Sequence, residues 1–155
     1  MNDFSARKLG EVLAFAETFN DTLERGAEAF SSESLDTKQF SELSHNHTQA
    51  IKAAADAAGK LDVTLAKAEA TNKKLRVMRD TYIGDSWDDI TELYEWMGFF
   101  CGAAIVHWEL IEGVAEGSDN DGLGKIAIDA KGFYESFFER SRKHLHALGS
   151  RRQAE

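Results

Sequence analysis

The stretch LYEWMGFFCGAAIVHWELI, residues 93–111, constrains the fold of this chain more than any other feature. Fourteen of its nineteen side chains are apolar, whereas 29% of the residues in the whole chain are charged. A helix that is apolar on more than one face must be buried from more than one side. The stretch therefore predicts either a helix at the centre of a bundle or a helix at a contact between subunits.

The rest of the composition favours long helices. The 155 residues include no proline, a residue that is common in turns and at the edges of β-sheets and is excluded from helix interiors. The middle of the chain is rich in alanine, glutamate, lysine and leucine, which have high helix propensity. A chain of this length can bury a sizeable core without disulfides or metals. We expect an all-α protein with residues 1–155 in a single helical-bundle domain.

Apolar residues that recur at three- and four-residue intervals predict the first two helices. The first spans about residues 5–30, and Asp36 is a candidate N-cap for the second. The second keeps its rhythm from about residue 37 to residue 82, which makes ~69 Å of helix at about 1.5 Å per residue. Gly59 is the one plausible break in 37–82, and a hairpin at this residue is the alternative. We favour a continuous or slightly bent helix, because a lone glycine costs only about 1 kcal/mol in a helix interior.

Two further helices complete the predicted fold. The third covers residues 86–116 and begins with Ser86 and Asp89, which resemble a capping box. The fourth runs from about residue 123 to residue 148 and ends at Gly149. These elements predict an antiparallel up-and-down four-helix bundle with coiled-coil packing and one overlong second helix.

The third helix separates into two apolar stripes that lie about 120° apart at about 100° per residue. A helix of a four-helix bundle buries one broad stripe, and an exposed second stripe would form an aromatic patch of a kind that monomers avoid. We therefore expect a homodimer in which a two-fold axis relates two copies of this helix. The alternative is that the second helix or the loops cover the second stripe within one chain. The main stripe is Ile90, Leu93, Met97, Phe100, Ala104, Trp108 and Ile111. The predicted interface is Trp96, Phe99, Ala103, Val106 and Leu110, beside the small residues Gly98 and Gly102, which allow close approach of helices.

The net charge of −9 is unevenly distributed along the chain. Residues 80–124 contain no lysine or arginine, whereas residues 140–152 contain five. A basic tail of this kind suits nucleic acid, but cations also favour the C-terminus of any helix. The overall pI near 5.0 opposes binding to a phosphate backbone. We expect no nucleic-acid partner for this acidic protein.

The sequence also bears on cellular location. Cys101 is the single cysteine; it cannot form an internal disulfide, and its apolar surroundings predict a buried, inert thiol. The N-terminus is polar and lacks the apolar segment of a secretory signal. The uninterrupted apolar run 96–106 is shorter than the ~20 residues that span a bilayer, and Glu92, Glu95 and Glu109 would be costly in lipid. We expect a cytoplasmic protein without a membrane span.

Metal binding is the sharpest enzymatic alternative, because helical bundles hold di-iron sites built from carboxylates and two Glu-x-x-His motifs. Glu42 and His45 form one such motif on the second helix. The required twin is missing from the fourth helix, where Glu139 and His144 are five residues apart. The remaining candidates for an iron, zinc or haem ligand are His47, His107 and Glu109.

No nucleophile and base are spaced for catalysis, and the loop GSDNDGLGK lacks the spacing of a phosphate-binding P-loop. The sequence favours a non-catalytic, oligomeric helical-bundle protein that acts through protein–protein contacts and self-associates through helix 86–116. A protein partner is expected along the protruding half of the long second helix, and no cofactor is expected. The alternative is a metal- or cofactor-binding bundle of ferritin-like architecture that serves as an oxidoreductase or sensor.

Overall fold

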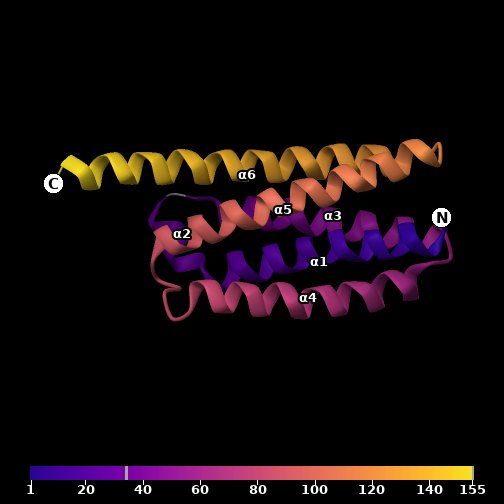
Figure 1. The fold of residues 1–155 in the computed structure, drawn as a ribbon, viewed down its shortest axis with the longest axis horizontal. Helices are drawn as coiled ribbons and strands as arrows, with labels where there is room; N and C mark the ends of the chain where they lie inside the picture. Colours follow the sequence, from indigo (N-terminus) through magenta and orange to yellow (C-terminus); the bar gives the residue numbers. More distant parts are fainter. Residues whose placement is uncertain (34, 155) are drawn as a thin grey trace.

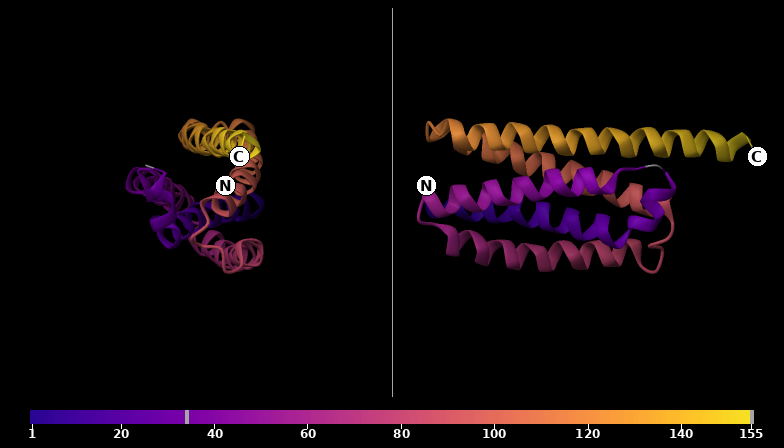
Figure 2. Two further views of the ribbon diagram at one scale, coloured as in Figure 1. Left: turned by 90° about the vertical axis from the view of Figure 1, so that its left-hand side faces the viewer. Right: turned by 180° about the vertical axis from the view of Figure 1, so that it is seen from behind.

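The computed structural model describes residues 1–33 and 35–154, and this part of the chain consists of helices and short connections, without β-strands (Figure 1). Successive long helices run in opposite directions, with their axes side by side (Figure 2). The all-α prediction is confirmed, but five long helices replace the expected four. The described helices are α1 (Asp3–Arg25), the short α2 (Ala27–Ser32), α3 (Thr37–Ala57), α4 (Leu61–Ile83), α5 (Ile90–Gly117) and α6 (Asp121–Ala154).

The prediction of one continuous helix over residues 37–82 is wrong. α3 ends at Ala57, α4 begins at Leu61, and the two helices run antiparallel to each other (Figure 1). The hairpin brings both helices against α1, so each buries a face that a single long helix would have left in solvent. The protruding half helix, along which a protein partner was expected, is therefore not present in this fold.

Gly59 makes the turn between α3 and α4. Its φ of 63° lies in the left-handed region, which favours glycine. The backbone N–H of Lys60 donates to the carbonyl oxygen of Ala55 at 2.9 Å, and that of Gly59 donates to Asp56 at 2.8 Å. These two hydrogen bonds form a Schellman motif, which satisfies the last carbonyl groups of α3 and ends the helix.

The ends of the other helices differ from the predictions by several residues. Asp89, and not Ser86, is the N-cap of α5, and its carboxylate accepts from the backbone N–H of Thr91 at 2.8 Å. α6 continues through Gly149 to Ala154, and its C-terminal end projects beyond the other helices (Figure 1). The prediction that α6 ends at Gly149 is therefore wrong. The predicted N-cap of α3 is confirmed, because the side chain of Asp36 accepts from the backbone N–H of Gln39.

α1, and not the more apolar α5, is the helix that the others surround. It packs against α3, α4 and α5, and 14 of its 23 residues are buried. α5 packs mainly against α6 and then against α1. The main stripe predicted for α5 is confirmed, because all its members from Leu93 to Ile111 are buried and Ile90 packs against the core at the start of the helix.

α1 and α4 approach each other closely at Gly10. The hydroxyl group of Thr64 donates to the carbonyl oxygen of Ala6 at 3.1 Å. A Cβ atom on Gly10 would overlap the backbone oxygen of Thr64 and lie 2.8 Å from the Cβ atom of Lys67. Glycine is thus required at this position by the spacing of the two helices.

Gly10→Ala should lower the free energy of unfolding by ~1–2 kcal/mol, because overlap with the main chain of α4 costs more than the ~1 kcal/mol gained by replacing glycine in a helix. Gly132→Ala is the matched control, because Gly132 lies inside α6 and a Cβ atom there would meet open space. It should stabilise the protein by up to ~1 kcal/mol. Urea denaturation measures both values, and a stabilising Gly10→Ala would contradict the close approach of α1 and α4.

Candidate self-association surface on α5

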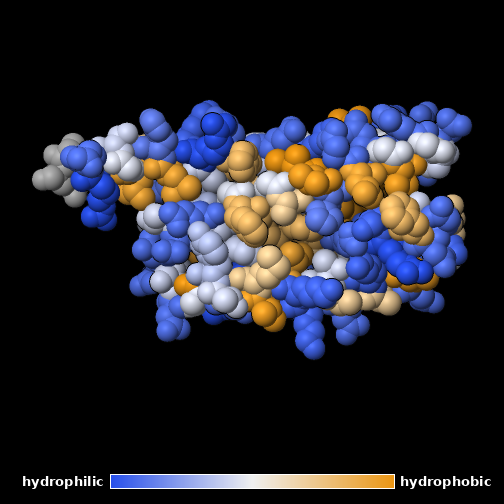
Figure 3. All heavy atoms as spheres, viewed as in Figure 1, coloured by the Kyte–Doolittle hydropathy of each residue, from blue (hydrophilic) through white to orange (hydrophobic). Residues whose placement is uncertain are grey.

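Three large apolar residues of α5 face solvent. Phe99, Val106 and Leu110 have exposed fractions of 58%, 67% and 40%. At about 100° per residue they share one side of the helix, and we call these three residues the outward face of α5. Apolar side chains gather along the middle of the molecule over α5, between the more polar surfaces of α6 and α4 (Figure 3). The outward face is part of the stripe predicted from sequence to join two copies of the chain.

Trp96 belongs to the same predicted stripe, but its side chain is only 1% exposed. Its ring packs against Tyr82 of α4, with ring centroids 5.9 Å apart, and against Phe100 at 5.7 Å. Ala103 is half-buried and packs against the core. Residues of the same chain therefore cover Trp96 and, in part, Ala103. This is the alternative that the sequence left open beside a dimer contact.

Gly98 and Gly102, which were also assigned to the predicted interface, lie on the side of α5 that faces α6. A Cβ atom on Gly98 would be 3.7 Å from the Cβ atom of Ser141, and one on Gly102 would be 3.7 Å from the ring of Phe138. The small residues thus serve the packing of α5 on α6 within the chain. Of the seven residues predicted to form the interface, the outward face alone remains substantially exposed.

The outward face is acidic beyond Phe99. Glu95 lies one turn before Phe99 and is exposed. Its carboxylate accepts a hydrogen bond from the hydroxyl group of Tyr82 at 3.4 Å. Glu92 lies three residues before Glu95, in the first turn of the helix. No lysine or arginine occurs between residues 80 and 124 to neutralise this end.

Two lysines lie at the other end of the outward face. Lys8 of α1 lines a shallow hollow together with Val106 and Leu110. Lys8 and Lys67 both contact the carboxylate of Glu11, at 3.0 Å and 3.1 Å. Burial raises the pKa of Glu11, but hydrogen bonds from the two lysines outweigh burial and lower it. Glu11 therefore stays ionised and neutralises one of the two cations.

The residues considered as metal ligands lie in separate environments. His47 of α3 packs edge-on against Phe133 of α6, with ring centroids 5.3 Å apart. Burial lowers the pKa of its imidazole, against the opposing effect of Asp129. Glu109 accepts from the ammonium group of Lys131 at 2.9 Å. His47 and Glu109 therefore contact different residues of α6, namely Phe133 and Lys131.

His107 faces α1 and not α6. Its Nδ1 atom lies 2.9 Å from the carbonyl oxygen of Ala103, and its Nε2 atom lies 3.7 Å from the carboxylate of Glu11. The structure thus does not bring His47, His107 and Glu109 together. Among residues 1–33 and 35–154, no group of three or more histidine, cysteine, aspartate or glutamate side chains is placed to hold a metal ion.

The thiol of Cys101 is fully buried. Burial raises the pKa of this thiol far above its usual range. Because the thiolate is the reactive form of cysteine, the side chain is chemically inert in the folded protein, as predicted from its apolar neighbours.

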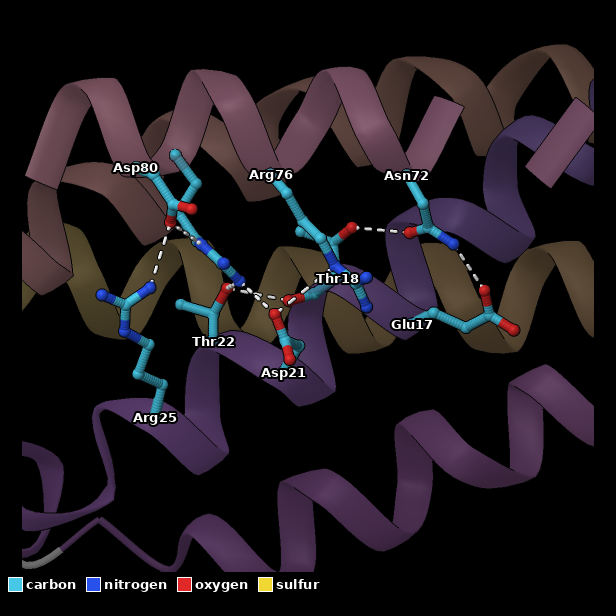
Figure 4. Close-up of polar contacts among 9 residues, drawn as sticks. Glu17, Thr18, Asp21, Thr22, Arg25, Asn72, Arg76 and Asp80 are labelled. Carbon is cyan, nitrogen blue, oxygen red and sulfur yellow. Dashed lines mark hydrogen bonds and ion pairs between the residues drawn. The ribbon is translucent and has the colours of Figure 1, made fainter. Parts of the chain in front are cut away.

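The sequence patterns did not predict a polar network between α1 and α4 (Figure 4). Arg79 of α4 is 3% exposed, and its guanidinium group contacts Asp21 at 2.5 Å and Asp80 at 2.9 Å. It also lies 5.1 Å from the centre of the Trp87 ring, and Arg25 lies 3.8 Å from the same ring. The network therefore ties α1, α4 and the connection to α5 together.

Asn72 extends this network along α4. Its side-chain oxygen accepts from the hydroxyl group of Thr18 at 2.8 Å, and its amide nitrogen donates to Glu17 at 2.6 Å. A buried amide finds its hydrogen-bond partners in a single register of the two helices, and it therefore favours that register over others. The signal was present in the sequence, because Asn72 and Arg79 are polar residues on the same apolar line of α4 as Ala68 and Leu75.

By length and composition alone, α5 could cross a membrane, and it is the one helix among the described residues that meets this criterion. A buried helix of a soluble protein meets the same criterion. The polar residues Glu95 and Glu109 lie within the helix, and its main stripe packs against the core of the protein.

Comparison with protein-family models, with curated proteins and with solved structures finds no match to this chain.

Proposed function

We propose that this protein is a non-catalytic, oligomeric helical protein that acts through protein–protein contacts, and that the outward face of α5 joins two copies of the chain. The observation that carries the proposal is the exposure of Phe99, Val106 and Leu110 along one side of a helix whose other sides are packed. Each large apolar side chain that is removed from water contributes about 1.5–3 kcal/mol. Two copies bury six such side chains, which favours association.

The charges at the two ends support a two-fold arrangement with the α5 helices antiparallel. A two-fold axis that crosses the outward face midway between residues 99 and 106 places Phe99 of each copy opposite Val106 of the other. The same axis brings Glu95 of each copy toward Lys8 of the other. Complementary charges of this kind fix the register of an interface and increase the rate of association. A two-fold contact is also self-limiting, so it produces a closed dimer and not a filament.

Val106→Glu should weaken self-association by at least about tenfold, because two carboxylates would enter the apolar contact. Val77→Glu is the matched control. Val77 is 61% exposed on α4, close to the 67% of Val106, and it lies about 140° around the helix from Tyr82, the residue of α4 that faces α5. Size-exclusion chromatography with light scattering gives the mass of each variant.

The expected result is a dimer for the wild-type protein and for Val77→Glu, and a monomer for Val106→Glu at the same concentration. Circular dichroism checks that both variants fold. A dimer that is unchanged by Val106→Glu, or one that is lost equally in both variants, would contradict association through α5. Trp96 is unsuitable for this test, because its buried side chain supports the fold itself.

A further inference from the structure

A polar pocket lies on a different side of α5 from the outward face, where the end of α2 and the C-terminal half of α6 meet the start of α5. Tyr94 of α5 lines this pocket, and it points about 140° away from Phe99 at about 100° per residue. The other lining residues are Glu33, Ser136, Glu139, Arg140, Lys143 and His144. The pocket is therefore separate from the surface proposed for self-association.

Two stacked rings form the wall of the pocket. The rings of Tyr94 and His144 have centroids 4.2 Å apart and an interplanar angle of 26°. The His144 side chain is 10% exposed, and its Nδ1 atom lies 3.5 Å from the carboxylate of Glu33. Its Nε2 atom is buried and has no hydrogen-bond partner among the described residues. The Nδ1 edge of the imidazole therefore lies on the side of Glu33, which also lines the pocket.

Ser136, Arg140 and Lys143 project from one side of α6, because they are spaced four and three residues apart. Within residues 1–33 and 35–154, no carboxylate lies within ion-pair distance of Arg140. Its guanidinium group lies 5.6 Å from the centre of the Phe40 ring. It also adjoins the hydroxyl group of Tyr94, where burial raises the pKa of the phenol and Arg140 opposes that rise.

Lys143 is also incompletely neutralised. Its ammonium group lies 3.8 Å from Glu139, and the same carboxylate accepts a shorter hydrogen bond from Arg142 at 3.0 Å. Arg140 and Lys143 therefore line the pocket with two carboxylates, of which Glu139 pairs with Arg142 and Glu33 lies beside His144. With Arg142 counted, three cations stand against these two carboxylates.

We propose that the pocket binds a phosphate group. The planar guanidinium group of Arg140 offers two parallel N–H donors to phosphate oxygens. Lys143 supplies a second positive charge, and the hydroxyl group of Ser136 supplies a further donor. Phosphate carries more oxygen acceptors than a carboxylate, so it engages these donors together, whereas Glu33 reaches His144 alone. The bound phosphate replaces Glu33 beside the imidazole of His144.

Phosphate binding is tested on the full-length protein by titration with inorganic phosphate and, separately, with glycerol phosphate, at constant ionic strength. The readouts are the NMR signals of the His144 imidazole and calorimetric heat. Saturable binding of both probes shows a site for the phosphate group itself. Binding of one probe alone identifies free phosphate or a phosphate monoester as the ligand. Absence of saturable binding by either probe overturns the proposal.

Arg140→Gln should reduce phosphate affinity by at least about tenfold, because a bidentate, charge-assisted contact is lost. Lys125→Gln is the matched control, because Lys125 is exposed on the same helix and does not line the pocket. It should leave the affinity unchanged. Lys143→Gln repeats the test at a side chain that is 77% exposed and so does not carry the fold. An equal loss in Arg140→Gln and Lys125→Gln would show attraction to general surface charge and would overturn the site.

Discussion

Trp108→Ala should lower the free energy of unfolding by about 3–5 kcal/mol, the range for removal of a large buried aromatic side chain. Trp108 is fully buried on the main stripe of α5, where the helix packs against the core. The substitution removes apolar contacts and leaves a cavity that the neighbouring helices cannot fill by small shifts. Chemical denaturation followed by circular dichroism measures the change.

Phe99→Ala is the control for this substitution, because it truncates an aromatic residue on the opposite, exposed side of the same helix. Its effect on the free energy of unfolding of the monomer should be within about 0.5 kcal/mol. Both substitutions are compared in the Val106→Glu background, so that loss of self-association does not contribute. Similar losses for Trp108→Ala and Phe99→Ala would show that the two sides of α5 are not distinguished as the structure requires.

Arg79→Ala should lower the free energy of unfolding by about 2–3 kcal/mol, toward the lower end of the cost of breaking a buried ion pair. The value is reduced because the partners Asp21 and Asp80 are themselves partly exposed. The substitution also removes the guanidinium group of Arg79 from its position 5.1 Å from the centre of the Trp87 ring. Urea denaturation at neutral pH measures the change.

Arg76→Ala is the control for Arg79→Ala, because Arg76 lies one turn earlier on α4 and contacts the same Asp21 at 3.5 Å. Its side chain is largely exposed, and an exposed ion pair contributes at most about 1 kcal/mol. A larger loss for Arg76→Ala than for Arg79→Ala would contradict the assignment of Arg79 as the buried member of the network.

The sequence predicted α5 well because its hydrophobic periodicity is strong. It did not predict the hairpin at Gly59, because α3 and α4 each bury one side against α1 and their apolar residues continue the same three- and four-residue rhythm. The physical signal for the turn was the glycine itself, followed by Lys60, in the arrangement that ends a helix through a Schellman motif. Because a glycine inside a helix costs little free energy, the glycine alone did not favour a turn over a continuous helix.

On α3 and α4, small polar residues are buried at positions where large apolar neighbours are exposed. Ser44 and Thr64 are fully buried, whereas the neighbouring Leu43 and Leu65 are exposed. Ser44 donates to the carbonyl oxygen of Ala16 at 3.2 Å, in the same way that Thr64 contacts α1. Close spacing of helices selects small side chains over large apolar ones, and the periodicity of one helix does not reveal how near its neighbour lies.

The sequence predicted only part of the candidate interface, because the pattern of one helix does not show which neighbours cover it. The pattern of α5 identified a second apolar stripe, but it did not show that Tyr82 covers Trp96 or that α6 occupies the side with Gly98 and Gly102. The pocket at Tyr94 and His144 was not predicted at all, because its residues come from three segments that are brought together by the fold. Their spacing in the sequence carries no motif.

Sedimentation equilibrium of the wild-type protein at micromolar concentration tests the central claim most directly. Association through the outward face of α5 predicts a species of twice the 17.2 kDa of one chain, without larger assemblies, because a two-fold contact closes on itself. A mass of 17.2 kDa across the whole concentration range would contradict the claim that this protein acts as a dimer.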